Sequence, residues 1–481
     1  MIREPRWWRQ RASAARFAAF DQGKLGGIVG SRIEDARSLL GWVLERCRRV
    51  SRRTWIFIIV GISFLSLIFG SYLAGQFDFS TSQKPPPPPP PHAPPSYPPT
   101  AAPGQLIDWV PPDMDPIVHG VKASEGVNRK PDYDLIPFPY SPMTMTEAQQ
   151  QEADQRRHPW LGAVICSAWD VKRRMMIRYT WMKLYKDVPM DQRFVISNPG
   201  PQWTQIVQME NQTYGDMIVL EDLPEDDFTA NTVKTVEFYR WLAEKSPRKY
   251  ALVSKLDTDL WVNARALWDR HLAPLLDGLD STGPIEANVN HTVVGQLYYS
   301  GLHRTAFPHG AMYTATWDIV ELLPTLQDEF HIIAGEDVTM AWLLMKGKQK
   351  INLLALNEAE KFEFDKNDLR PGEITAWARN TTDVTSQWHA LYGKEAIGIH
   401  QLKNDNDWLI VATCFDENGV KDMPTEPEQL PNPDDKKPGY PRPWHESIPD
   451  PYWETDTDGR ILVNGVWKLE AGVGRDMKKN E

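Results

Sequence analysis

The segment that decides the fold is Lys249–Asn263, whose sequence is KYALVSKLDTDLWVN. It begins with the apolar and aromatic run Tyr250–Val253, which predicts a buried β-strand. The strand leads into Asp257-Thr258-Asp259, and a second apolar run, Leu260–Val262, follows. Two carboxylates between apolar flanks are costly to bury unless they are paired, and a divalent cation would pair with both. Oxygen ligands of this kind suit Mn²⁺ or Mg²⁺, which can also bind the phosphates of a substrate.

The same tripeptide occurs a second time, at Asp456-Thr457-Asp458. A bare Asp-x-Asp is more often a solvated acidic turn than a metal site. The second copy is followed by Gly459-Arg460 and lies in a polar, proline-rich part of the chain, so we interpret it as a turn. Only the apolar residues on both sides distinguish the first copy.

Apolar runs alternate with helical patterns on both sides of the central segment. Strands are predicted at 161–167, 193–197, 216–220 and 250–253, and helices at 171–185, 231–245 and 264–276. This alternation predicts an α/β fold with a mainly parallel sheet and helices on both faces. Ligands of such sheets bind at the carboxyl ends of the strands, where Asp257 and Asp259 fall. Further along the chain, Ile461–Leu469 predicts a small hairpin with a turn at Asn464-Gly465.

The N-terminal part of the chain predicts a membrane anchor. Residues Trp55–Ala74 carry no charge and are long enough to span a bilayer, and the alternative is a buried core helix. Arginines crowd the N-terminal side, which favours a cytoplasmic N-terminus and a lumenal remainder, as in a single-pass type II protein. The predicted organisation is a basic cytoplasmic tail (1–53), a transmembrane anchor (54–75), a proline-rich lumenal stem (76–158), a folded domain (159–423) and a proline- and acid-rich C-terminal extension (424–481).

The composition of this 481-residue chain limits the classes of partner that it can bind. Its net charge is −11, and the N-terminal tail is net positive whereas the remainder of the chain is acidic, so we expect no nucleic-acid partner. Three Asn-x-Thr sequons, at Asn211, Asn290 and Asn380, follow the predicted anchor and fit a lumenal glycoprotein. Cys166 and Cys414 also follow the anchor, and the sequence leaves open whether they pair.

Two further positions could carry chemistry. Glu336 and Asp337 precede an apolar helical run, where an acidic residue is either a helix-dipole partner or a general base. His400 ends the apolar run Ala396–His400 and is either a core histidine or a metal ligand. The residues alone do not decide between these interpretations.

Several segments, in this order, resemble glycosyltransferase family 31, the β-1,3-galactosyltransferase-like enzymes. The resemblance covers roughly residues 160–415, and Lys255–Asn263 is similar to the family motif K-x-D-D-D-V-F-V-N. The other matching segments are Arg173–Trp181 (RRMMIRYTW), Tyr214–Asp222, Thr232–Thr235, Gly310–Tyr313 and Gly335–Val338. The chain departs from the family at Thr258, in the middle of the aspartate triplet, and in its glycine-rich stretch, which lacks the cysteine and most glycines.

The resemblance implies a GT-A-like fold and an inverting, metal-dependent enzyme. Such an enzyme transfers galactose, or N-acetylglucosamine, from a UDP-sugar to a glycan acceptor, in the β-1,3 linkage that gives this family its name. It implies Asp259 and His400 as ligands of Mn²⁺ (or Mg²⁺), and Asp257 and Arg178 beside the nucleotide and its phosphates. Asp337 would be the general base that deprotonates the acceptor hydroxyl.

The resemblance further implies a single-pass protein of the Golgi membrane with its transferase domain in the lumen. Two alternatives stay open. An inactive relative would serve as a lumenal binding or chaperone partner. A two-carboxylate glycosidase would instead use Asp337 together with an aspartate of the central motif.

Overall fold

The computed structural model describes residues 115–135, 157–281, 283–370, 372, 374–379, 387–422, 448 and 452–469. The chain separates into two compact units, Met1–Pro95 and Ser96–Glu481, and every described residue belongs to the second. The predicted tail and anchor (1–53 and 54–75) lie outside the described residues, as does most of the predicted stem. Within the described ranges no helix is both long and apolar enough to cross a membrane.

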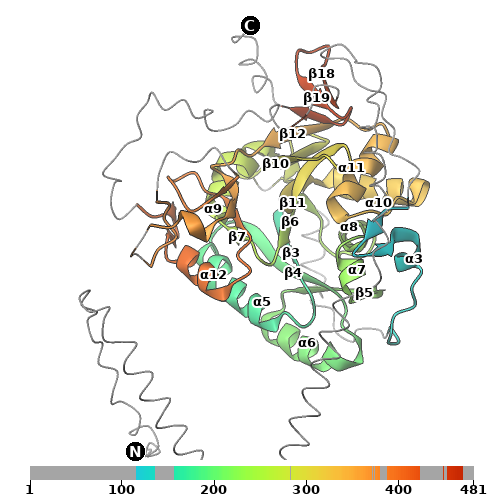
Figure 1. Ribbon diagram of the computed structural model, residues 1–481, viewed down its shortest axis with the longest axis horizontal. Coiled ribbons are helices and arrows are strands. Elements are labelled where there is room, and N and C mark those ends of the chain that lie inside the picture. Colours follow the sequence, from blue (N-terminus) through green and yellow to red (C-terminus); the bar gives the residue numbers. More distant parts are fainter. Residues whose placement is uncertain are drawn as a thin grey trace, which may run out of the picture. The chain divides into compact units, whose positions relative to one another are not determined.

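A ten-stranded sheet forms the centre of the described unit (Figure 1). Its strands, from edge to edge, are β18 (Trp453–Thr455), β19 (Ile461–Val463), β20 (Trp467–Leu469), β12 (Ile351–Ala355), β10 (Thr292–Ser300), β11 (Thr305–Thr316), β6 (Tyr250–Asp257), β3 (His158–Ile165), β4 (Met190–Asn198) and β5 (Met217–Pro224). Strands β6, β3, β4 and β5 are parallel to one another, and β12 is parallel to both of its neighbours. Strand β11 is antiparallel to both β10 and β6. The predicted α/β fold with a mainly parallel sheet is therefore confirmed.

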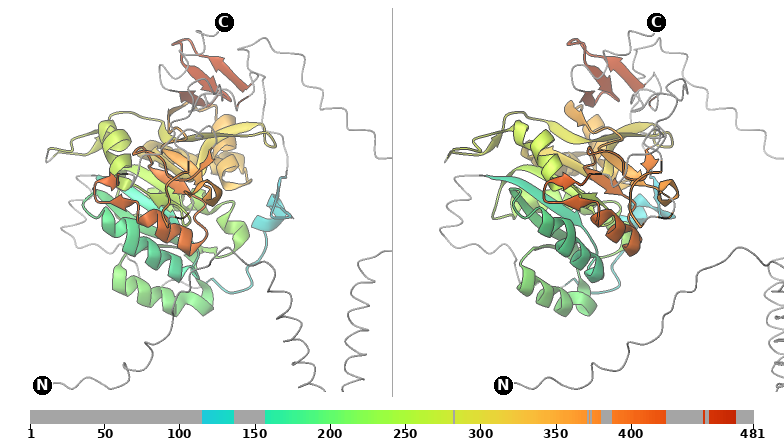
Figure 2. Two further views of the ribbon diagram at one scale, coloured as in Figure 1. Left: turned by 60° about the vertical axis from the view of Figure 1, so that its left-hand side comes forward. Right: turned by 90° about the vertical axis from the view of Figure 1, so that its left-hand side faces the viewer.

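Helices cover both faces of this sheet, as predicted. One face carries α5 (Val171–Ile177), α6 (Gly200–Tyr214), α9 (Ala264–Leu267) and α12 (Asp405–Ala412). The other face carries α8 (Lys234–Glu244), α10 (Trp317–Phe330) and α11 (Glu336–Lys346). The two views in Figure 2 show α12, α5 and α6 next to one another on the first face.

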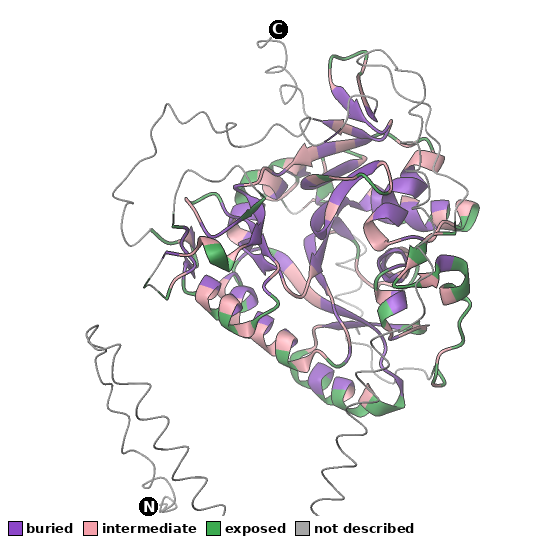
Figure 3. Ribbon diagram, in the orientation of Figure 1, coloured by how far each residue is buried: buried purple, intermediate pink, exposed green. Residues whose placement is uncertain are grey.

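Alternating side chains of the parallel strands build a separate core on each face. In β3, Trp160 and Val164 belong to one core, whereas Leu161 and Ala163 belong to the other. Successive residues of a strand point to opposite faces, so a strand covered on both sides is apolar at nearly every position. Figure 3 shows this continuous burial along the central strands. It is the reason why short apolar runs predicted these strands.

Helix α6 was not predicted. It starts at Gly200-Pro201, and only four of its residues are buried: Gly200, Val207, Glu210 and Asn211. Two of these four are polar, so the segment shows little apolar periodicity. Its contact with the sheet depends on buried polar groups, which a hydrophobic pattern does not reveal.

A second, four-stranded sheet lies where the Asp-Thr-Asp segment leaves β6. Its strand order is β14 (Trp388–His389), β13 (Lys361–Phe364), β15 (Gly398–His400) and β7 (Trp261–Val262). Strand β6 belongs to the main sheet and β7 to the small sheet, so Asp257-Thr258-Asp259 forms the junction between them. The backbone oxygen of Asp259 accepts a hydrogen bond of 2.9 Å from the N–H of Leu402, which fixes the junction against the end of β15.

The predicted hairpin at 461–469 is confirmed as β19 and β20, which pair antiparallel. Unexpectedly, it extends the main sheet, because β20 pairs in parallel with β12. The indole N–H of Trp467 donates to the backbone oxygen of Ala306 at 2.6 Å, and the side-chain oxygen of Asn464 accepts from the N–H of Ala306 at 2.7 Å. These contacts fasten the C-terminal strands to the start of β11.

Two of the predicted modification sites differ sharply in exposure. Asn211 is fully buried, and its side-chain oxygen accepts a hydrogen bond from the N–H of Met217 at 3.2 Å. A glycan on Asn211 is therefore incompatible with this fold. Asn290 is exposed, whereas Asn380 lies outside the described residues.

Cys166 and Cys414 are separate, buried free thiols, so they do not pair in this structure.

Candidate active site

The junction of the two sheets brings three predicted site residues together. Asp257 ends β6, Asp259 follows two residues later, and His400 is the last residue of β15. The Nε2 atom of His400 lies 3.2 Å from Oδ1 of Asp259 and 3.9 Å from Oδ2 of Asp257. One ligand atom from each of the three residues lies within 4.8 Å of the others. Two carboxylates and one imidazole in this arrangement can hold a divalent cation.

Glu363 orients the His400 ring from the opposite side. The two residues are register partners of the parallel strands β13 and β15, and Nδ1 of His400 lies 2.6 Å from Oε2 of Glu363. Histidines that bind metals commonly donate their second ring N–H to a carboxylate in this way, which directs the free nitrogen to the metal. Burial lowers the pKa of His400, but hydrogen bonds and charges from Asp259 and Glu363 outweigh it and raise that pKa to about 9.

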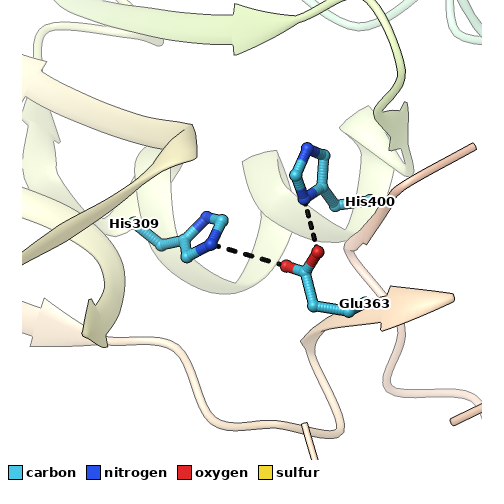
Figure 4. A group of neighbouring side chains, drawn as sticks. All are labelled: His309, Glu363 and His400. Atoms are coloured by element: carbon cyan, nitrogen blue, oxygen red, sulfur yellow. Dashed lines mark hydrogen bonds and ion pairs between the residues drawn. The ribbon is translucent and has the colours of Figure 1, made fainter. Parts of the chain in front are cut away.

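A second combination of possible ligands shares two of these side chains. It consists of His309, Glu363 and His400, and Figure 4 shows Glu363 between the two histidine rings. However, the fully buried ammonium of Lys361 forms an ion pair with Glu363 and lies 3.1 Å from Nδ1 of His309. A cation here would have to displace that ammonium. The set Asp257, Asp259 and His400 therefore fits a metal ion better.

Lys255 connects this set with a second pair of carboxylates. Its side chain is almost completely buried, and Nζ lies 2.7 Å from Oδ1 of Asp257 and 3.0 Å from Oε1 of Glu336. Nζ also donates to the backbone oxygen of Gly310 at 2.7 Å. Burial lowers the pKa of Lys255, but the nearby carboxylates outweigh it, so the net pKa is well above the usual range. Lys255 is therefore a fixed positive charge at the centre of the site.

Asp337 lies in the first turn of α11, against the backbone of β11. Its Oδ2 accepts a hydrogen bond of 3.2 Å from the N–H of Gly310. A Cβ atom on residue 310 would lie 2.0 Å from Oδ1 of Asp337, so only glycine permits this approach. Burial and, next, the charge of Glu336 raise the pKa of Asp337 to about 7. A carboxylate with a pKa near neutrality is suited to general-base chemistry.

The structure also distinguishes Asp337 from its neighbour Glu336. Oε1 of Glu336 accepts a hydrogen bond from the hydroxyl of Thr235 at 2.7 Å and pairs with Lys255. Within the described part of the chain, Asp337 accepts a single hydrogen bond, from the backbone of Gly310. Glu336 is thus held by two side chains, which leaves Asp337 the better placed of the two to accept a proton.

Comparison with known proteins gives a family match for the central part of the chain. Residues 172–353 match the family model described as Galactosyltransferase. The chain contains a domain of the galactosyltransferase family. This domain match confirms the resemblance seen in the sequence motifs, and it spans Asp257, Asp259 and Asp337. His400 and Glu363 lie beyond the matched residues. No curated protein matches the chain.

Similar solved structures include two glycosyltransferases that share about a tenth of their residues with this chain. The galactosyltransferase LgtC, in complex with donor and acceptor sugar analogs, is 10% identical, with 50% of this chain and 86% of LgtC covered and a TM-score of 0.30. Mouse xyloside xylosyltransferase 1 in its apo form is 9% identical, with 52% and 98% covered and a TM-score of 0.30. At these scores the likeness by itself identifies neither the fold nor the substrate.

Arg178 is the one predicted site residue of the galactosyltransferase-family domain that does not join the cluster. Its guanidinium is bound by both oxygens of Asp216 at 2.7 Å and by Oε1 of Glu210 at 2.6 Å. Asp216 immediately precedes β5, and strands β3 and β4 lie between β5 and the Asp257-bearing β6. The structure therefore places Arg178 in a buried ion-pair network near β5, and its contact with nucleotide phosphates stays a prediction.

Sequence reasoning assigned no role to Glu363, Lys361 or Lys255. A signal was nevertheless present, because Lys361-Phe362-Glu363-Phe364 places two charges inside a short strand that is buried at all four positions. Charged side chains are almost never fully buried unless they are paired. The pattern indicates a buried ionic site, although it does not name the partners.

We expect Glu363→Gln to weaken Mn²⁺ binding by about 10-fold, because the amide no longer holds the His400 ring as a carboxylate does. Isothermal titration of the full-length chain with Mn²⁺ measures this directly, without any substrate. Glu360→Gln is the matched control, since Glu360 contacts His271 rather than His400. Equal Mn²⁺ affinity of the wild type and Glu363→Gln would show that Glu363 does not orient a metal ligand.

Proposed function

We propose that this protein is a metal-dependent, inverting glycosyltransferase of GT-A type. It transfers galactose from UDP-galactose to a hydroxyl group of a glycan acceptor, in a β-1,3 linkage. N-acetylglucosamine is the second candidate for the transferred sugar. The observation that carries the proposal is the convergence of Asp257, Asp259 and His400 at the end of β6, with Asp337 joined to them through Lys255 and Gly310.

The residues at the sheet junction would hold the metal ion. Asp259 and His400 would supply an oxygen and a nitrogen ligand, and Asp257 would supply a further oxygen. When bound there, Mn²⁺ (or Mg²⁺) neutralises negative charge that develops on the departing diphosphate. Glu363 holds His400 in orientation, and Lys255 balances the charge of Asp257 from within the protein.

Asp337 would act on the acceptor. Its carboxylate accepts the proton of the acceptor hydroxyl as that oxygen bonds to the anomeric carbon of the donor sugar. The bond between the anomeric carbon and the UDP oxygen breaks on the opposite face, so the configuration inverts. The N–H of Gly310 holds one carboxylate oxygen, which leaves the other to receive the proton.

The proposal includes a location in the Golgi membrane. The uncharged segment Trp55–Ala74, with arginines before it and a proline-rich stretch after it, supports a type II anchor with the transferase domain in the lumen. The donor and acceptor would then meet the domain on the lumenal side.

Turnover of nucleotide sugars tests this function. The purified full-length chain is incubated with UDP-galactose, UDP-N-acetylglucosamine and other UDP-sugars, with Mn²⁺ or with EDTA, and UDP release is measured. We expect UDP release from UDP-galactose that EDTA abolishes. Asp259→Ala should raise the Mn²⁺ concentration needed for half-maximal activity about 100-fold, because it removes a direct ligand of the ion.

The chain offers its own control for this substitution. Asp458→Ala makes the same change at the same position of the second Asp-Thr-Asp, where the carboxylate pairs with Lys468 at the surface. It should leave the Mn²⁺ dependence unchanged. If no UDP-sugar is turned over by the wild type, the transferase function is wrong and an inactive lumenal relative becomes the better description. Activity that is insensitive to EDTA would contradict the metal dependence.

A further inference from the structure

An exposed aromatic side chain lies directly beside the candidate active site. Tyr298, on β10, is 38% exposed, and its ring centroid lies 5.6 Å from that of His309 in an edge-on arrangement. The ring of His309 lies 5.5 Å from that of His400. A continuous series of ring contacts therefore leads from the candidate metal ligands to an aromatic side chain at the surface.

The candidate base contacts the backbone next to His309. His309 is followed in β11 by Gly310, whose N–H holds the carboxylate of Asp337. Tyr298 and Phe307 are register partners of β10 and β11, and their rings lie 5.5 Å apart, so Tyr298 is held in place on the hairpin. Among the described residues, the exposed aromatic side chains Trp169, Tyr179 and Tyr214 belong to the segments around α5 and α6, on the first face of the sheet, and Trp388 lies on β14 of the small sheet.

We propose that Tyr298 is the platform on which the acceptor sugar ring stacks. This inference rests on the proposed function and specifies where the acceptor binds. A pyranose ring has an apolar face of C–H groups, which packs on an aromatic ring, while the phenol hydroxyl can bond with a sugar hydroxyl. Ligand sites commonly combine such an aromatic surface with a few converging polar groups. Here Asp337 would receive the reacting hydroxyl and Tyr298 would orient the ring that carries it.

Tyr298 would contact the acceptor and not the donor. Its loss should therefore change the KM for the acceptor and leave the KM for the donor nearly unchanged. Tyr298→Ala should raise the KM for the acceptor about tenfold, with kcat, the KM for UDP-galactose and acceptor-free UDP release changed less than about twofold. Tyr298→Phe keeps the ring and should stay within about threefold of the wild type. Tyr179→Ala is the control, because it removes an aromatic ring that is 65% exposed but lies just after α5, away from Tyr298. It should change none of these values.

The acceptor probes are p-nitrophenyl pyranosides of galactose, N-acetylglucosamine, N-acetylgalactosamine and xylose, assayed with the full-length chain. An unchanged acceptor KM in Tyr298→Ala, or a parallel loss of acceptor-free UDP release, would overturn the platform while leaving the transferase function intact. The platform is also overturned, and the transferase function kept, if the wild type releases UDP but transfers sugar to none of the pyranosides. If the wild type turns over no UDP-sugar, the transferase function itself fails, and the platform fails with it.

Discussion

Asp337→Asn should lower kcat about 10²- to 10⁴-fold, because an amide cannot accept the proton of the acceptor hydroxyl. The amide oxygen can still accept the hydrogen bond from Gly310, so the site should otherwise stay intact. Steady-state kinetics should therefore show an unchanged KM for the UDP-sugar, and calorimetry an unchanged Mn²⁺ affinity.

The alternative role of Asp337, that of a helix-dipole partner, has a matched control in the same domain. Asp318 lies in the first turn of α10 as Asp337 lies in the first turn of α11. Asp318→Asn should leave kcat within about twofold, because a dipole partner contributes only stability. Equal losses of kcat in the two variants would show that Asp337 supports the helix and is not the base.

The stability of the folded chain should depend on pH through the carboxyl group of Asp337. Burial, and next the charge of Glu336, raise the pKa of Asp337 from 3.8 to about 7 in the folded chain. Between these values the folded chain binds more protons than the unfolded chain, so this group's contribution to stability falls as the pH rises. Asp337→Asn removes the contribution. Urea unfolding should therefore show the variant gaining stability relative to the wild type between about pH 4 and about pH 7. A constant difference would contradict the raised pKa.

Glu210→Ala should destabilise the domain by about 3–5 kcal/mol, because it leaves two buried guanidinium groups without their shared partner. Oε2 of Glu210 lies 2.7 Å from Arg174, and Oε1 lies 2.6 Å from Arg178. The exposed fractions of these side chains are 4% for Glu210, 0% for Arg174 and 7% for Arg178. The network also joins α6 to α5, so its loss would loosen the contact between these helices.

Urea unfolding at neutral pH measures this effect, and an exposed ion pair provides the control. Asp222→Ala removes the partner of Lys245, whose side chain is 56% exposed, and should cost less than about 1 kcal/mol. Burial raises the pKa of Glu210, but its bonds with Arg174 and Arg178 outweigh it and lower that pKa below 4.5. This contribution to stability is therefore present above pH 4.5 and is lost as the pH falls further. Equal costs for Glu210→Ala and Asp222→Ala would refute the role of the buried network.

Local sequence patterns were sufficient for the parallel strands β3, β4, β5 and β6 and for most helices, whereas β10, β11 and β12 of the main sheet were not predicted. Strands such as β6 are covered on both faces, so their burial appears as an unbroken apolar run. Helix α6 was not predicted, because Glu210 and Asn211 bury polar side chains where a hydrophobic pattern expects apolar ones. The hairpin 461–469 was predicted from its turn. Its place at the edge of the main sheet was not, because the partner strand β12 lies about a hundred residues earlier and carries no matching local signal.

The sequence by itself determined which residues could carry the chemistry: Asp257 and Asp259 at a strand end, Glu336 or Asp337 at a helix start, and His400 as either a core histidine or a metal ligand. Each follows from neighbouring residues, whose spacing fixes where a short segment ends and what it presents there. Only the tertiary structure decided which of these side chains meet. Glu363 faces His400 through the register of β13 and β15, and Arg178 is held by Glu210 of α6, on the same face of the sheet. Such contacts join segments that are far apart in the chain, and they depend on strand order and register, which no local pattern encodes.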